Sequence, residues 1–146
     1  MGMDLVGANG RPWRFSAMQW GRVLDLAELY GWIPQGTAPP ELPDGMRVLR
    51  DGEVWSGGYG SNDYQRVTAD DARALAAALE QALDDLPGAE PVHKLRVLVL
   101  PNSRTIRCWD PDAPLPTAVE VFAGPDARRQ LEGFIRFCRA GGFCIG

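Results

Sequence analysis

Three stretches of the chain carry apolar residues at helical spacing, and each predicts an amphipathic helix. The first covers about 17–30, where Ser16 followed by Gln19 fits a capping box. The second follows Thr68 and is rich in alanine and leucine, and the third starts at Pro125, whose missing N–H is harmless in a first turn. The apolar stripes contain Trp20, Val23, Leu24, Ala27 and Tyr30, then Leu75, Ala76, Leu79, Leu83 and Leu86, and last Leu131, Phe134, Ile135 and Cys138.

Short extended runs between these helices predict strands. Residues 11–16 alternate apolar and polar side chains, and 143–146 follow the Gly-Gly pair that ends the third helix. Residues 117–124 also have the composition of a strand. Two further segments predict hairpins, 46–55 around an Asp-Gly turn and 93–109 around a Pro-Asn-Ser turn.

Together these patterns predict a single α+β domain over 1–146, with about three amphipathic helices packed on a small, mostly antiparallel sheet. Antiparallel pairing is favoured because only some of the links between strands contain helices. Residues 31–45 hold four prolines and three glycines and predict an irregular segment. Residues 92–121 have the character of a hairpin elaboration on the domain.

Composition and charge are those of a globular protein. The 146 residues are 45% hydrophobic and 23% charged, and a net charge of −4 argues weakly against a nucleic-acid partner. The N-terminal segment lacks the features of a signal peptide, and no apolar run approaches the ~20 residues that a membrane helix needs. The three cysteines include no CxxC pair and favour free thiols in a reducing compartment. We therefore expect a cytoplasmic protein with no membrane partner.

A glycine-rich segment precedes the second helix and raises the question of a ligand site. Gly57, Gly58 and Gly60 fit neither the dinucleotide nor the P-loop pattern, and the helix begins too late for them to present its amides to a phosphate. The simpler interpretation is a tight turn in which Gly58 or Gly60 adopts a positive φ. Asp70 and Asp71 at the start of the helix are explained by capping and by the helix dipole.

Polar and aromatic side chains of the same segment form the best candidate site, which comprises Trp55, Tyr59, Asn62, Asp63 and Tyr64. In one interpretation they line a ligand or partner surface, with Asp63 as an acid, a base or an orienting group. In the other, Asn62 and Asp63 form an Asx-type turn that satisfies backbone amides before the helix. The sequence favours the second interpretation and leaves the first open.

Catalytic and metal chemistry have little support in the sequence. His93 is the single histidine, so a histidine triad or a histidine-rich metal site would depend on it alone. Cys138 and Cys144 lack a second close cysteine pair and are surrounded by apolar residues, as small buried hydrophobes would be, and Cys108 is the remaining thiol. We therefore predict no catalytic residue, no metal ion and no cofactor.

Three blocks of the sequence resemble a group of small uncharacterised bacterial and phage proteins. They are the Tyr-Gly-Trp-x-Pro-x-Gly-Thr segment after the first helix, the Asn-Asp-x-Gln stretch before the second, and the Phe-Cys-Arg-x-Gly-Gly-Phe ending. The resemblance leaves the 92–121 hairpin outside. It implies one small domain, and it brings no activity and no site residue with it.

These features favour a non-enzymatic protein-interaction module, for example an immunity-type or anti-defence inhibitor that occludes its partner's surface. The partner would be another protein, met through the candidate residues at 55–64. The alternative is a small-molecule-binding domain or a small enzyme with a cleft near Tyr59–Asp63, to which Arg66 would contribute. A deep pocket with converging side chains would favour the alternative, and a flat exposed patch would favour the first hypothesis.

Overall fold

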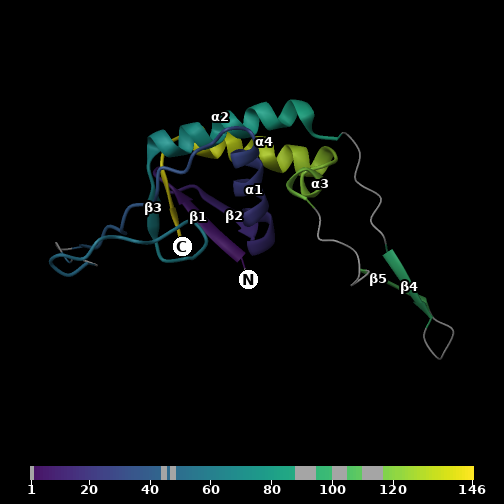
Figure 1. The fold of residues 1–146 in the computed structure, drawn as a ribbon, viewed down its shortest axis with the longest axis horizontal. Helices are drawn as coiled ribbons and strands as arrows, with labels where there is room; N and C mark the ends of the chain where they lie inside the picture. Colours follow the sequence, from purple (N-terminus) through teal and green to yellow (C-terminus); the bar gives the residue numbers. More distant parts are fainter. Residues whose placement is uncertain (1, 44–45, 47–48, 88–94, 100–104, 110–116) are drawn as a thin grey trace.

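The central sheet brings the two ends of the chain together (Figure 1). The computed structural model describes residues 2–43, 46, 49–87, 95–99, 105–109 and 117–146, and its antiparallel sheet has the strand order β2-β1-β6-β3. The strands are β1 (Gly2–Gly7), β2 (Pro12–Ser16), β3 (Gln65–Val67) and β6 (Phe143–Ile145). The C-terminal β6 lies between β1 and β3, so that Cys144 is opposite Val6 on one side and Arg66 on the other. The sheet is therefore complete only when both ends of the chain are in place.

Helices pack on one face of this sheet. In the described residues they are α1 (Ala17–Leu29), α2 (Ala69–Asp85), α3 (Ala118–Val121) and α4 (Pro125–Arg139). The two longest, α2 and α4, lie side by side, and α1 contacts α2 as well as strands β1 and β2 (Figure 1). The sheet residues that face the helices are buried, namely Met3, Leu5, Phe15, Gln65, Val67, Phe143 and Ile145. This is the single α+β domain that the sequence predicts.

An aromatic cluster fills the space between α1, α4 and the sheet. Phe15 of β2 stacks on Trp20 of α1 with 6.0 Å between ring centroids, and Phe134 of α4 meets Phe15 edge-on at 5.0 Å. All three side chains are fully buried. Burying one such side chain contributes about 1.5–3 kcal/mol, so this cluster is a major source of the domain's stability.

The helix termini confirm the signals in the sequence. Ser16 and Gln19 form the capping box of α1, Thr68 caps α2, and Pro125 is the first residue of α4. Gly31, which follows α1, has a φ of +93°, a conformation that favours glycine over other residues. No helix in the described residues is both long enough and apolar enough to cross a membrane.

The structure corrects the strand predicted at 117–124. Thr117 and Glu120 form a further capping box there, so the segment begins as the short helix α3. The structure also adds β1, which the sequence pattern did not predict. Only Met3 and Leu5 form its buried face, and a glycine lies at each end of the strand, so the alternating pattern is too short to predict it.

The hairpin predicted at 93–109 is confirmed for its strands. β4 (Leu95–Val99) and β5 (Thr105–Trp109) pair antiparallel as a two-stranded sheet of their own. The turn that joins them and His93 lie outside the described residues. Figure 1 shows this hairpin apart from the helices and the central sheet.

The hairpin predicted at 46–55 keeps only its turn. The N–H of Glu53 donates to the carbonyl of Arg50 at 3.0 Å, and Gly52 has a φ of +87°. No strand flanks this turn in the residues of 46–55 that the structure describes. The Asp-Gly signal therefore predicts the turn correctly, whereas the described residues beside the turn do not pair as strands.

Substitution of two glycines, one crowded and one in open space, tests the close packing next to the C-terminal strand. A Cβ on Gly142 would lie 2.5 Å from the carbonyl oxygen of Val67, whereas a Cβ on Gly21 of α1 would meet open space. We expect Gly142→Ala to lower the free energy of unfolding by about 1–3 kcal/mol through steric overlap. Gly21→Ala should raise it by about 0.5–1 kcal/mol because alanine favours a helix interior. Urea denaturation followed by circular dichroism measures both, and equal effects would contradict the close approach at Gly142.

Candidate functional site

The predicted site lies in the 33–64 loop, the segment from Ile33 to Tyr64 that joins α1 to β3. Its described residues form no α-helix and no strand, and one isolated bridge pairs Ala38 with Arg66 of β3. Part of the loop projects away from the helices beyond β3 (Figure 1). Irregular segments of this length are uncommon in compact domains and are often functional. The contacts that hold the loop are therefore central to its role.

A buried carboxylate holds the base of the loop. Asp71 in the first turn of α2 is fully buried, and its two oxygens accept hydrogen bonds from Trp32 Nε1 at 2.9 Å and from the Tyr59 hydroxyl at 2.5 Å. The rings of Trp32 and Tyr59 meet edge-on with 5.4 Å between their centroids. We call these three residues the Asp71 anchor. Because Trp32 precedes the loop and Tyr59 lies near its end, the anchor ties both ends of the loop to α2.

The hydroxyl and the carbonyl of Tyr59 are both hydrogen-bonded within the protein. Its hydroxyl donates to Asp71 and accepts the N–H of Gly36 at 3.0 Å, and its carbonyl accepts Trp20 Nε1 at 2.7 Å. Burial, together with the hydrogen bond to Asp71, raises the pKa of Tyr59 well above its ordinary value. Tyr59 therefore keeps its proton at neutral pH and acts as a structural donor.

Two further side chains pin the returning part of the loop. Gln65 is fully buried, and its Nε2 donates to the carbonyls of Gly58 at 2.8 Å and Ser61 at 2.6 Å. The indole of Trp55 donates to the hydroxyl of Thr37 at 3.0 Å, which links the outgoing and returning parts of the loop. The glycine-rich segment is thus shaped by side chains that satisfy its backbone carbonyls.

The candidate residues divide into two groups by exposure. Trp55 and Tyr59 are half-buried and hydrogen-bonded as described, whereas Asn62, Asp63 and Tyr64 are exposed. Asn62 donates from Nδ2 to the carbonyl of Gly2 in β1 at 3.0 Å, and Asp63 accepts the hydroxyl of Ser61 at 2.6 Å. The side chain of Asn62 thus bonds to the first strand, and that of Asp63 to a neighbouring side chain. The Asx-type turn that the sequence predicts would instead bond these side chains to nearby backbone amides.

Backbone strain in the loop falls on Tyr64. Its φ is +59°, the single positive φ among the described residues that are not glycine. Such a conformation is uncommon for a residue with a Cβ, and the hydrogen bond from its N–H to the carbonyl of Ile145 at 2.8 Å helps to hold it. The prediction of a positive φ at Gly58 or Gly60 is wrong, since the described glycines of the loop with a positive φ are Gly36 at +91° and Gly52 at +87°.

The 33–64 loop exposes apolar side chains. The exposed fractions are 81% for Ile33, 66% for Met46 and 87% for Val54, and Leu42 and Tyr64 are exposed as well. Single exposed apolar residues are normal on a protein surface, but five on one projecting loop form a candidate contact region.

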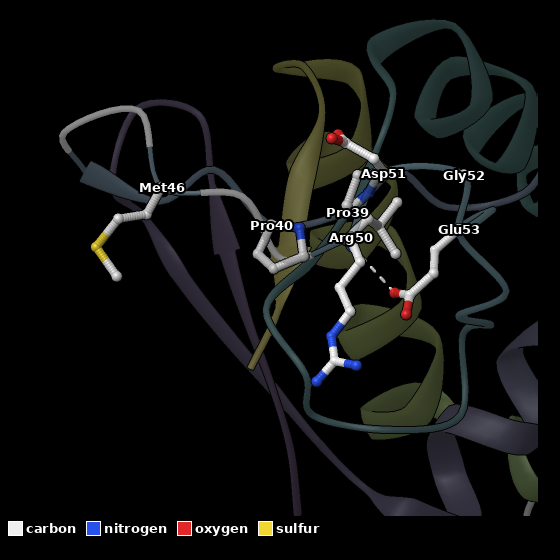
Figure 2. A pocket seen from close by; sticks show the side chains of 8 residues that line it. Pro39, Pro40, Met46, Arg50, Asp51, Gly52 and Glu53 are labelled. Atoms are coloured by element: carbon white, nitrogen blue, oxygen red, sulfur yellow. Dashed lines mark hydrogen bonds between the residues drawn. The ribbon is translucent and has the colours of Figure 1, made fainter.

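A shallow hollow of about 420 Å³ lies between the two limbs of the loop. Figure 2 shows Pro39 and Pro40 on the outgoing limb facing the turn from Arg50 to Glu53, with Met46 directed away from the others. The N–H of Arg50 donates to the Glu53 carboxylate at 3.1 Å and closes the turn. The hollow is thus built from two prolines and a hydrogen-bonded turn.

A second hollow of about 530 Å³ lies on the sheet face that the helices leave open. Val6, Arg66 and Cys144 lie side by side there on β1, β3 and β6. Arg66 is held by the carbonyl of Pro39 at 2.9 Å and by an ion pair with Glu41. Of the residues predicted for a cleft at 59–66, Arg66 lines this hollow, whereas Tyr59, Asn62 and Asp63 do not.

The two thiols that the structure describes, Cys138 and Cys144, have little of the character of reactive groups. Cys138 is fully buried, and burial together with the nearby charge of Asp71 raises the pKa of its thiol. Cys144 is half-buried in β6. Within the described residues, no group of three or more His, Cys, Asp or Glu side chains is placed to hold a metal ion.

Asp71, the centre of this arrangement, is not among the site residues that the sequence predicts. Capping and the helix dipole explain its position at the start of α2, although it lies four residues before Leu75 on the buried stripe of that helix. Extending the stripe by one turn would have placed a carboxylate in the core, where it needs hydrogen-bond donors. The spacing therefore contained a signal for Asp71, but it did not identify Trp32 and Tyr59 as the donors.

No family model matches the chain, and no curated protein or solved structure is significantly similar to it. The resemblance to small bacterial and phage proteins stays a prediction. Functional inference therefore depends on the geometry of the molecule itself.

Removing the buried carboxylate tests the Asp71 anchor. We expect Asp71→Ala to lower the free energy of unfolding by about 2–5 kcal/mol, because it leaves two buried donors without an acceptor. The neighbouring Asp70→Ala should change it by less than about 1 kcal/mol, since the ion pair of Asp70 with Arg73 is on the surface. Urea denaturation followed by tryptophan fluorescence compares the two, and similar losses would contradict the anchor.

The raised pKa of Tyr59 predicts that the folded protein loses stability at alkaline pH. The raised pKa keeps Tyr59 protonated in the folded state at a pH where the unfolded chain has lost this proton. Its contribution to the free energy of unfolding is therefore full below about pH 10 and is lost as the pH rises toward the folded-state pKa. Tyr59→Phe should make the decline between about pH 9 and 11 shallower. Tyr64→Phe, an exposed control, should keep the original slope; identical slopes in all three proteins would contradict the assignment.

Proposed function

We propose that this chain is a non-enzymatic protein-interaction module that binds another protein through the 33–64 loop. It acts by covering the bound surface, as an immunity-type or anti-defence inhibitor would. The observation that carries this proposal is the combination of a hydrogen-bonded base and exposed apolar side chains on one loop.

The Asp71 anchor makes the loop suitable for binding because it lowers the conformational entropy that the loop loses when it binds a partner. A loop that must be ordered on binding loses affinity, whereas a loop fixed beforehand keeps it. The direct bonds of Trp32 and Tyr59 to α2 fix both ends of this loop to the most regular part of the domain. The buried Gln65 adds two more contacts to the returning limb.

The exposed side chains fit the composition of a contact surface. A typical stable interface covers about 800 Å² on each partner, and a few large side chains provide most of the binding energy. Met46 and Val54 belong to the projecting part of the loop, and Tyr64 adds an exposed aromatic ring near the sheet. Trp55 and Tyr59 support this surface from beneath.

Charge favours a basic partner. Between Ile33 and Tyr64 the sequence has the acidic residues Glu41, Asp44, Asp51, Glu53 and Asp63 and the basic residues Arg47 and Arg50. An acidic loop on an acidic chain speeds association with a basic surface and disfavours nucleic acid. The expected partner is therefore a protein with a basic surface that also offers an apolar depression.

The alternative of a small-molecule cleft at Tyr59–Asp63 has less support. Tyr59 and Asp71 direct their polar groups at each other, and Asp63 is paired with Ser61. A catalytic or ligand-binding group needs a free polar atom that faces the bound molecule. The exposed loop is thus the stronger basis for a function.

A pair of charge substitutions tests the proposal. Met46→Asp with Val54→Asp should weaken capture of a stoichiometric partner from source-cell lysate at least about tenfold, because each places a charge in an apolar contact. Met18→Asp, at an exposed apolar position on α1, is the matched control and should leave capture unchanged. Quantitative mass spectrometry of the captured proteins measures both. The proposal fails if no stoichiometric partner is found in cells where the protein acts, or if the loop variant captures it as well as the control does.

A further inference from the structure

The two limbs of the 33–64 loop are joined a second time, farther along both limbs than the Asp71 anchor. The hydroxyl of Thr37 accepts Trp55 Nε1 at 3.0 Å and donates to the carbonyl oxygen of Gly57 at 2.7 Å. A hydroxyl has one proton to donate and lone pairs to accept with, so both bonds form at once. Thr37 belongs to the outgoing limb, and Trp55 and Gly57 belong to the returning limb. We call these three residues the loop neck.

The returning limb turns one side toward the outgoing limb. Along 54–60 exposure alternates, so that Trp55, Gly57 and Tyr59 are half-buried and the residues between them are exposed. This alternation is typical of extended chain, in which successive side chains point to opposite sides. The hydroxyl of Tyr59 accepts the N–H of Gly36 on the outgoing limb at 3.0 Å. The half-buried side of the returning limb is therefore the side that contacts the outgoing limb.

The absence of a side chain at position 57 is part of the neck. A Cβ on Gly57 would lie 2.2 Å from Cζ2 of Trp55, whereas a Cβ on Gly58 would meet nothing within 4 Å. Neither glycine has a positive φ, so the two positions differ in steric room and not in backbone strain. Any residue with a Cβ at position 57 would therefore displace the Trp55 ring from its place beside Thr37.

The neck lies next to the hollow between the two limbs. Pro39 and Pro40 follow Thr37 closely on the outgoing limb, and the turn from Arg50 to Glu53 comes just before Trp55 on the returning limb (Figure 2). These segments line the hollow of about 420 Å³. The bonds of Thr37 therefore set how far apart the two walls of the hollow stand.

We infer that Thr37 is a positioning residue for the proposed binding loop, and that its hydroxyl closes a neck that opens separately from the Asp71 anchor. The neck and the anchor share no residue, so one can open while the other stays closed. The partner binds the loop with its neck closed, because limbs fixed beforehand lose less conformational entropy on binding. Thr37 acts through Trp55 and Gly57. The inference rests on the proposed function for what the loop binds.

Two matched pairs of variants of the full chain test the neck. Thr37→Val removes the hydroxyl and keeps the shape of the side chain, whereas Thr37→Ser keeps the hydroxyl. Gly57→Ala forces the Trp55 ring away, whereas Gly58→Ala meets open space. In nuclear magnetic resonance, the indole N–H of Trp55 should exchange with solvent at least about tenfold faster in Thr37→Val and Gly57→Ala than in their controls. The indole N–H of Trp32 should keep its slow exchange in all four variants, which also shows that they are folded.

Binding is then measured by calorimetry, with the purified protein that the loop captures as the probe. The dissociation constant should rise at least about threefold in Thr37→Val and Gly57→Ala, because affinity falls with the fraction of molecules whose neck is closed. Thr37→Ser and Gly58→Ala should bind like the unaltered chain.

The possible failures are distinguishable. Equal exchange of the Trp55 indole within either pair overturns the inference, and so does faster exchange with unchanged affinity. Faster exchange of the Trp32 indole together with that of Trp55 also overturns it, because the neck and the anchor would then open as one. The exchange measurement needs no partner. A failure of the proposed function appears elsewhere, as capture that does not respond to Met46→Asp with Val54→Asp.

Discussion

The hydrogen bonds to the buried carboxylate of Asp71 are the constraint on which the rest of the site depends. A carboxylate removed from water is costly unless its oxygens find donors, and here Trp32 and Tyr59 supply one donor to each oxygen. These donors come from the two ends of a long irregular loop, so satisfying one buried group also closes that loop. The same carboxylate lies in the first turn of α2, where the helix dipole favours a negative charge.

This arrangement separates the residues that build the loop from those whose side chains face solvent. Trp55 and Tyr59 bond to neighbouring parts of the same protein, whereas Met46, Val54 and Tyr64 face solvent. On a flexible loop, the binding energy of exposed apolar side chains would be offset in large part by the entropy lost when the loop becomes ordered. On an anchored loop they keep more of this energy, and this is the physical reason for our proposal that the 33–64 loop binds another protein.

Two projecting features extend from opposite ends of α2. The 33–64 loop is anchored at its N-terminal turn, and the β4–β5 hairpin lies beyond its C-terminal end (Figure 1).

The sequence by itself determined the helices and strands that depend on residues close together along the chain. The three long helices, their caps at Ser16 and Thr68, and the β4–β5 pairing all follow from local periodicity and capping. The prediction was wrong at 117–124, where the composition favoured a strand and a capping box produced a helix turn. There the two local signals conflicted, and the hydrogen bonds of the cap prevailed.

Only the tertiary structure decided the strand order and the role of the candidate residues. β6 enters the sheet between β1 and β3, an arrangement that depends on contacts between the two ends of the chain. The glycine-rich segment identified Tyr59 and Trp55 as residues of interest, but their bonding partners are 12 and 18 residues away in the sequence, and Trp32 is 39 residues from Asp71. Whether an aromatic side chain is an inner support or an outer contact depends on such distant partners. Local pattern has no information about them, because hydrogen bonds of this kind form only when the core brings the segments together.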